Sequence, residues 1–185
     1  MDNRTLILEA CITVFNSKGI KFTMDDLAAE LSMSKKTIYT VFDDKEELFL
    51  AMVDYCFDGI KEAERKVVED ESLSTVEKIR SILGVMPDCY KTLDFSQLYV
   101  IKDKYPSVYA KMNMRLESGW EGTMSLIEKG IKEGVIRNIH PVVLKTIYEA
   151  SLETFLKSDT LQKSGIKYQK AFEETVEILM EGILA

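Results

Sequence analysis

The sequence has few of the residues on which enzymes and metal sites depend. It holds one histidine and three cysteines among 185 residues. The cysteines, Cys11, Cys56 and Cys89, are widely spaced and lie among apolar residues, so no pair has metal-ligand spacing. We expect buried, reduced thiols, with a redox sensor as the alternative. No paired histidine and carboxylate, nucleophile motif or glycine-rich phosphate loop is present, so we expect no enzyme, no metal and no cofactor.

Long apolar runs are also lacking. No run reaches the ~20 residues that span a bilayer, and no cleavable leader is visible, so we expect a cytoplasmic protein without a membrane partner. The formal net charge of −7 argues against indiscriminate nucleic-acid binding, which needs a basic surface. It does not exclude a local basic face, because charges act within about 8–10 Å.

Proline is scarce as well, and this favours helices. Only three prolines occur, and apolar residues recur at helical spacing along most of the chain. The sequence therefore predicts an all-α fold of around nine helices, with no strand of substance. The predicted helices are one that ends at Gly19, two short ones capped by Thr23 and Ser34, and then 45–69, 74–90, 95–104, 107–133, 141–157 and 167–184.

The two short helices, joined by "LSMS", are typical of a helix-turn-helix motif. In that geometry the second helix enters the DNA major groove by its N-terminus. Lysine can donate to guanine, threonine can contact a base or phosphate, and a tyrosine hydroxyl can reach a phosphate. Ile38 and Phe42 are expected to face inward. The start of the next helix, at Lys45, suits a phosphate. The predicted DNA contacts are Thr23, Ser34, Lys35, Lys36, Thr37, Tyr39, Thr40 and Lys45.

These residues carry a resemblance to a known family. The segment "GIKFTMDDLAAELSMSKKTIYTVFDDKEELFLAMV", 19–53, resembles the N-terminal domain of the TetR-type (tetracycline-repressor-like) transcriptional regulators. It shares a glycine, a threonine cap, an apolar-alanine pair, Ser-Lys-x-Thr-aliphatic-Tyr-x-x-Phe and Lys-Glu-x-Leu. "KGIKEGVIR", 129–137, resembles the end of the family's helix seven. The family often has Gly or Ala at Lys36 and Tyr or His at Val41. Lys36 is therefore a candidate for operator-specific contact, whereas Val41 cannot donate to phosphate.

The resemblance implies two domains, a helix-turn-helix DNA-binding domain over 1–46 and a helical effector-binding and dimerisation domain over 47–185. The second region is rich in methionine and aromatic residues, which by themselves favour an ordinary core but together suit a pocket for an apolar ligand. The resemblance implies such a pocket, with Trp120, Met112 and Tyr90 as the strongest candidates. The full predicted set is Met52, Cys56, Met86, Tyr90, Met112, Leu116, Trp120, Met124 and Tyr148.

The last two long predicted helices resemble the family's dimer interface. Their apolar stripes would form a four-helix contact about a two-fold axis, although a single bundle can also use such stripes as internal core. The predicted interface residues are Leu144, Ile147, Ser151, Leu152, Phe155, Phe172, Val176, Leu179 and Ile183.

The sequence favours a dimeric, ligand-responsive regulator of transcription. We expect a repressor that binds a near-palindromic operator in double-stranded DNA and is released by a small, largely apolar effector. The alternative is a helical interaction module of the same fold that has lost DNA binding. The absence of a donor at Val41 and the acidic residues around the motif give this alternative some weight. The acidic residues around the motif are Asp25, Asp26, Asp43 and Asp44.

Overall fold

The structure is a computed structural model that describes residues 2–86 and 98–185. It confirms the all-α class: within these ranges no strand is present, apart from one isolated antiparallel bridge between Ile136 and Leu184. Contacts divide the chain into two compact units, Met1–Asp58 with Asp88–Met114, and Gly59–Pro87 with Arg115–Ala185. The boundary predicted from the family, between residues 46 and 47, stays a prediction.

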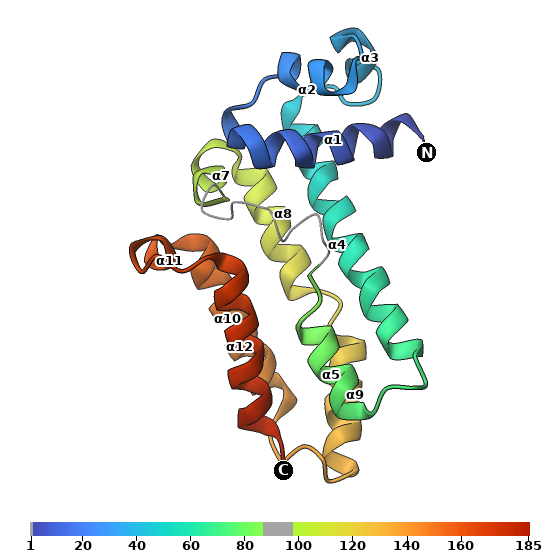
Figure 1. The fold of residues 1–185 in the computed structure, drawn as a ribbon, viewed down its shortest axis with the longest axis vertical. Helices are drawn as coiled ribbons and strands as arrows, with labels where there is room; N and C mark the ends of the chain where they lie inside the picture. Colours follow the sequence, from blue (N-terminus) through green and yellow to red (C-terminus); the bar gives the residue numbers. More distant parts are fainter. Residues whose placement is uncertain (1, 87–97) are drawn as a thin grey trace. The chain divides into compact units, whose positions relative to one another are not determined.

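The first unit is built around a short N-terminal bundle. Its core contains Ile7, Cys11 and Phe15 from the first helix, together with Leu27, all at most 1% exposed. Figure 1 shows the second and third helices lying across one side of the first. Its elements are α1 (Asn3–Lys18), the 3₁₀ helix η1 (Gly19–Lys21), α2 (Met24–Leu31), α3 (Lys35–Tyr39), the start of α4 (Lys45–Glu69), α7 (Leu98–Lys104) and most of α8 (Pro106–Glu117).

The starts of these helices follow from local capping chemistry. Asp2 caps α1 by accepting from the backbone N–H of Thr5 at 2.7 Å, and Gly19 ends that helix with φ of 65°. Side-chain oxygens accept the unsatisfied N–H groups of a helix's first turn, and glycine adopts positive φ without a Cβ clash. The Gly19 end, the 45–69 helix and the caps at Thr23 and Ser34 are confirmed.

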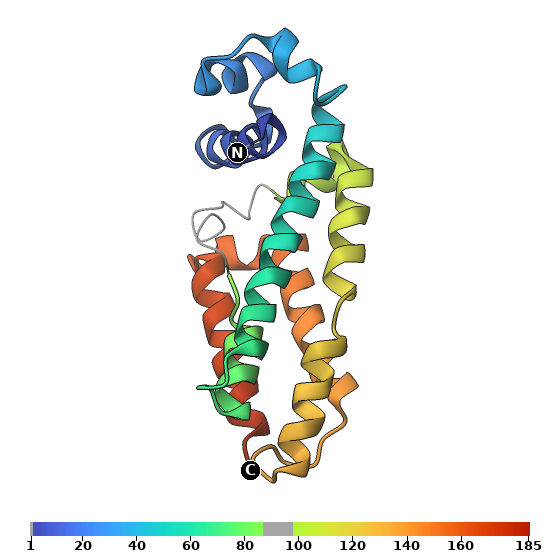
Figure 2. The ribbon, with the colours of Figure 1, turned by 90° about the vertical axis from the view of Figure 1, so that its right-hand side faces the viewer.

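The second unit has a separate apolar core. Figure 2 shows helices of this unit running side by side, and contacts pair α5 with α9, α10 with α12, and α10 with α9. Ile79, Ile127 and Met180 at the centre are fully buried. The elements are the end of α4, α5 (Thr75–Leu83), α9 (Glu121–Lys132), α10 (Pro141–Lys157), α11 (Thr160–Lys163) and α12 (Tyr168–Ile183).

Three elements differ from the sequence prediction. The single helix expected over 107–133 is two helices, because the chain breaks at Ser118–Trp120, where Gly119 has φ of 75°. The short helix α11 lies in a stretch predicted to be a polar connector. The helix predicted over 74–90 begins as expected, with Ser74 and Glu77 forming a capping box, but ends at Leu83. Its last predicted residues lie outside the described ranges.

The break between α8 and α9 is held by two lysines. Lys61 of α4 donates to the backbone carbonyl of Gly119 at 2.8 Å and pairs with Glu64, also at 2.8 Å. Lys145 of α10 donates to the carbonyl of Glu117 at 3.3 Å. These bonds satisfy carbonyl groups that the end of α8 leaves without an intrahelical partner.

Replacement of Gly119 by alanine is expected to lower the free energy of unfolding by about 1–2 kcal/mol, the cost of a left-handed conformation with a Cβ. An added Cβ would also lie 2.7 Å from Cε of Lys61, whose flexible side chain would have to move. Gly122→Ala is the matched control, because that glycine is helical with open space around it. It should leave stability unchanged or raise it by up to about 1 kcal/mol. Chemical denaturation checks both, and equal effects would contradict the assignment.

Candidate DNA-binding site

The candidate site is the α2–turn–α3 motif. Thr23 caps α2: its hydroxyl accepts from the N–H of Asp26 at 3.2 Å, and the Asp26 carboxylate accepts from the N–H of Thr23 at 2.6 Å. Lys18 contacts the same carboxylate, and this hydrogen bond is the largest cause that lowers the pKa of Asp26. Asp26, although shorter than the glutamate usual at this position, thus completes a reciprocal capping box with Thr23, which fixes where α2 begins.

The turn is three residues long and sharply bent. Ser32 has φ of 50°, the only positive value at a non-glycine residue in the described chain. The N–H of Met33 donates back to the carbonyl of Ala28 at 3.0 Å. Ser34 then caps α3, with its hydroxyl accepting from the N–H of Thr37 at 3.1 Å. These bonds fix the angle at which α3 leaves α2.

The recognition helix α3 has one buried and one exposed face. Ile38 and the following Phe42 are both 0% exposed, as predicted, and hold the helix to the unit. Lys36 is exposed at its N-terminus, and Tyr39 is 45% exposed. The Thr40 hydroxyl, also exposed, donates to the carbonyl of Thr37 at 2.6 Å. Because α3 is only five residues long, the residues predicted to contact DNA from it lie close together.

The Thr37 side chain, half-buried, has a structural partner of its own. Its hydroxyl lies 2.9 Å from the hydroxyl of Ser34, so both groups belong to the cap of α3. A hydroxyl engaged in this way can still accept a second hydrogen bond. Contact of Thr37 or Ser34 with DNA stays a prediction.

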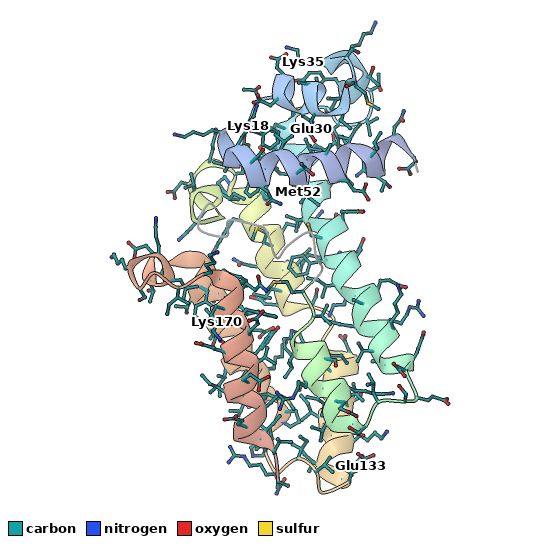
Figure 3. The ribbon with its side chains drawn as sticks, viewed as in Figure 1. Lys18, Glu30, Lys35, Met52, Glu133 and Lys170 are labelled. Carbon is teal, nitrogen blue, oxygen red and sulfur yellow. The ribbon has the colours of Figure 1, made fainter. Side chains whose placement is uncertain are left out.

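Lys35 is paired within the motif. Its ammonium lies 2.9 Å from the carboxylate of Asp25 on α2, and the hydrogen bond between them raises the pKa of Lys35. The Asp25 side chain is 73% exposed and that of Lys35 is 48% exposed. Figure 3 shows Lys35 on the side of α2 and α3 turned away from α1. An aspartate on the same surface therefore offsets the charge of one predicted phosphate ligand.

Lys45 is placed differently from the expectation. Its ammonium turns inward and donates to the backbone carbonyls of Ile20, at 2.8 Å, and of Phe22. It also lies 3.9 Å from the centre of the Phe22 ring and 5.2 Å from that of Phe49. A lysine engaged by two carbonyls and two rings does not project into solvent to meet a phosphate. This corrects the expected placement of Lys45.

The N-terminus of α4 is capped by side chains. Asp44 accepts from the N–H of Glu47 at 2.8 Å, while the Glu47 carboxylate accepts from the N–H of Asp43 at 2.6 Å. The side chain of Asp44 thus occupies the N–H of Glu47, one of the first-turn N–H groups of α4 that were expected to suit a phosphate. The positive end of the α4 dipole is thus compensated within the chain itself.

Arg4 was not predicted from the sequence. Its guanidinium lies 4.7 Å from the centre of the Phe42 ring, a cation–π contact that brings an exposed positive charge beside the end of α3. Arg4 lies on α1, whereas Phe42 lies in the loop between α3 and α4, and nothing in the local pattern of either residue indicates that the fold brings them together.

The predicted pocket residues fall into two groups. Buried Met52 and half-buried Cys56 and Met112 lie in the first unit, and the Cys11 thiol donates to the Met52 sulfur at 3.7 Å. Burial raises the pKa of the Cys11 thiol to about 12, as expected for an inert thiol. Tyr90 lies outside the described residues. Met86, Leu116, Trp120, Met124 and Tyr148 lie in the second unit.

Four members of the second-unit group, all except Met124, belong to the second core or pack against it. The rings of Trp120 and Tyr148 meet edge to face at 5.5 Å, and Met86 and Leu116 pack against the same core. The Tyr148 hydroxyl donates to the carbonyl of Leu83 at 2.8 Å. Trp120 Nε1 donates to the carbonyl of Leu116 at 3.1 Å. Each ring thus has a structural role in the core, and a role in ligand binding stays a prediction.

The predicted dimer stripes are mostly turned inward, which corrects the sequence assignment. Five of their residues are at most 5% exposed, because α10 and α12 pack against each other and against α5 and α9. They are Leu144, Leu152, Phe172, Val176 and Ile183. Phe155 and Leu179 pack against the same core, and the half-buried Ser151 donates to the carbonyl of Ile147 at 2.8 Å. Ile147, at 48% exposed, is the one predicted residue that faces outward.

Two short helices, a three-residue turn and a capped second helix with exposed lysines form a helix-turn-helix motif, the arrangement through which one class of transcriptional regulators binds DNA. Comparison with known proteins agrees: residues 7–52 match the family described as bacterial regulatory proteins, tetR family. The HTH-type transcriptional regulator YhgD of Bacillus subtilis is 33% identical over 152 residues, which cover 76% of this chain and 75% of YhgD. YvaF of the same organism is 29% identical over 185 residues, covering 100% of this chain and 96% of YvaF.

The whole fold also has a solved counterpart. The transcriptional regulator FadR of Bacillus subtilis, solved in complex with stearoyl-CoA, has a TM-score of 0.62 at 16% identity, covering 97% of this chain and 98% of that chain. The chain belongs to the TetR family of bacterial transcriptional regulators. It is thus a DNA-binding regulator of a family that is generally not enzymatic. Residues 2–86 and 98–185 contain no helix long and apolar enough to cross a membrane.

Replacement of Asp25 by asparagine is expected to raise DNA affinity by up to about fivefold at low salt, the range of surface ion-pair energies. The change frees the Lys35 ammonium and removes a negative charge that repels phosphates. Glu30→Gln is the matched control, since Glu30 lies on the same helix, is exposed and has no ion pair within the described ranges. Titration of DNA at several salt concentrations checks this. Equal effects of both changes would show that only net charge matters.

Proposed function

We propose that this protein is a dimeric repressor that binds a near-palindromic operator and leaves it when a small, largely apolar effector binds. The proposal rests on the two faces of α3. Ile38 and the following Phe42 are buried and hold the helix to its unit, while Lys36 and Tyr39 stay exposed. A helix held in this way can enter a major groove without first being ordered, so little free energy of binding is lost. We place DNA binding in residues 1–46.

Dimerisation is proposed on the outer faces of α10 and α12. Large apolar side chains remain exposed there: Val143 at 51%, Ile147 at 48% and Ile178 at 69%. Val143 and Ile147 are four residues apart and so lie on one helical face. A second copy related by a two-fold axis would cover this face on both subunits and present two recognition helices about 34–36 Å apart.

The proposed effector is small and largely apolar, and its site is assigned to residues 47–185. Met86, Leu116 and Trp120 pack against the second core, which contains Tyr148, and adaptable methionine and flat rings suit an apolar ligand. FadR, which shares this fold, was solved with stearoyl-CoA, whose acyl chain is apolar while its coenzyme A part is large and charged, so it supports only the apolar character of part of such a ligand. A ligand that prefers the conformation unable to bind DNA would release the operator.

The second candidate is a helical interaction module that no longer binds DNA. The pairing of Lys35 with Asp25 and the inward position of Lys45 favour it, because they leave Lys36 as the unpaired lysine of the predicted set within the described chain. Reversal of the Lys36 charge separates the two candidates.

Selection of bound duplexes from a random DNA pool is expected to yield a near-palindrome with half-sites one helical turn apart or a multiple of it. Lys36→Glu should then lower affinity for the selected DNA by more than tenfold, because a lysine–base contact is worth about 1–3 kcal/mol and the carboxylate also repels phosphates. Lys66→Glu, on the exposed far end of α4, is the control. Enrichment of no sequence at any salt concentration would instead support the interaction module.

Replacement of Ile147 and Ile178 together by aspartate is expected to convert a dimer into a monomer without lowering the free energy of unfolding of the subunit. Both side chains are about half or more exposed, so the subunit core is unaffected, whereas buried charges in the dimer contact are costly. Val68→Asp is the control, because this valine is 41% exposed on α4, outside the proposed contact. Sedimentation equilibrium measures the mass. A wild-type monomer at every concentration, or a dimeric double variant, would contradict the proposed interface.

A further inference from the structure

Lys45 is the first residue of α4 and follows the buried Phe42 by three positions. Its partners, the carbonyls of Ile20 and Phe22, lie just before Thr23, the cap of α2. We propose that Lys45 is a positioning residue: by joining the chain that enters the helix-turn-helix to the chain that leaves it, its ammonium sets the orientation of α3. The inference rests on DNA binding through α3, and it assigns Lys45 a role other than phosphate contact.

The bonds of Lys45 close a loop in the chain. Residues 22–45 contain α2, the turn and α3, and the two ends of this segment meet at the ammonium. A link across the base of a loop reduces the number of conformations available to it. The turn and the packing of Ile38 and Phe42 hold α3 from within the motif, and the bonds of Lys45 add a constraint at the two ends of the motif.

The surroundings of the ammonium form a rigid aromatic cluster. Phe49, one turn after Lys45 on α4, meets the rings of Phe15, Phe22 and Tyr105 edge to face, at 6.1, 5.6 and 5.1 Å. Two of these rings, Phe22 and Phe49, also face the ammonium. Cation–π contacts and hydrogen bonds of a charged group are stronger when desolvated, so the anchor is specific in direction as well as in distance.

The electrostatics of the site agree with this role. Within the described ranges Lys45 has no carboxylate partner, and burial is the largest cause that lowers its pKa to about 8. The ammonium of Lys104 on α7 acts in the same direction, while Cys11 on α1 and Asp26 on α2 act in the opposite one. A solvent-exposed phosphate ligand would keep an ordinary lysine pKa near 10.4.

If Lys45 is replaced, a positioning role and a phosphate contact predict different losses of DNA affinity. A phosphate contact strengthens binding to all DNA sequences equally and contributes about 0.9 to the slope of affinity against salt. A residue that orients α3 affects only complexes in which base edges are read. The ratio of affinities for the selected operator and for random DNA therefore separates the two roles.

The test compares Lys45→Met with Lys21→Met, which removes the same charge from an exposed neighbour of Ile20 and Phe22. Both proteins are titrated with the duplex selected from the random pool and with random duplex, at several salt concentrations and at a temperature where circular dichroism shows them folded. We expect Lys45→Met to lose operator affinity on the order of tenfold. Its affinity for random DNA and its salt slope should match those of Lys21→Met.

Two outcomes would overturn the proposal. Loss of affinity for both duplexes with a salt slope reduced by about 0.9 would make Lys45 a phosphate ligand. Unchanged affinity for both would make it a residue that only stabilises the fold. If Lys45→Met does not fold, Lys45→Gln, whose amide keeps a donor, is measured in the same way with the same outcomes.

A second measurement tests the anchor without DNA, so it stands even if no operator is found. In the folded chain the pKa of Lys45 is about 8, against 10.5 for the ordinary side chain. Between these values the unfolded chain binds the proton more tightly, so the free energy of unfolding of the wild type should rise with pH relative to Lys45→Met. A difference that does not change from pH 8 to 10.5 would show that folding leaves the proton affinity of Lys45 unchanged, and would contradict the net desolvation of the ammonium on which this part of the proposal rests.

Discussion

The burial of Ile38 and Phe42 is the contact on which the DNA-binding surface depends. A helix of five residues is far too short to be stable alone, because helix nucleation costs more than a single turn of hydrogen bonds returns. Packing of these two side chains into the first unit supplies the missing stabilisation, about 1.5–3 kcal/mol for a fully buried side chain. Capping by Ser34 and the sharp bend at Ser32 then fix the direction in which α3 points.

Charge in this motif is balanced locally rather than by the overall composition. The chain is acidic, with a formal charge of −7, yet its predicted recognition helix begins with two lysines. Asp25 offsets the charge of Lys35 on α3, and Asp26 pairs with Lys18 on α1. Because surface fields are screened within a Debye length, such neighbours decide how strongly the helix attracts phosphates, while distant acids mainly discourage indiscriminate binding.

The parts of the fold that were predictable from sequence are those fixed by local chemistry. The caps at Thr23, Ser34 and Ser74 require only residues three positions away, so short patterns reveal them. The break at Gly119 was missed, since a lone glycine inside an apolar helical pattern is compatible with an unbroken helix. Lys61, which contacts the carbonyl of Gly119, is 58 residues away in sequence, and no local pattern indicates the pairing.

The outward face of α10 also separates what local sequence predicts from what distant contacts decide. Periodicity shows that a helix has an apolar stripe, but the identity of the surface that covers the stripe is not encoded in the spacing. Leu144 and Leu152 carry the predicted stripe and are buried by α9 and α12 of the same chain, whereas Val143 and Ile147 stay exposed. Of the residues proposed for the dimer contact, Ile147 belongs to the predicted stripe, whereas Val143 and Ile178 lie outside it.

The sequence by itself determined the class of the protein, the position of the second helix of the motif and the caps that begin its helices, because each depends on side chains a few residues apart. The tertiary structure alone decided where the charges of the motif are directed. Lys35 faces Asp25, Arg4 lies over Phe42, and Lys45 turns inward to Ile20 and Phe22. The residue type is the same at Lys35, Lys36 and Lys45, so only the neighbours of each lysine in three dimensions separate a surface cation from an internal anchor.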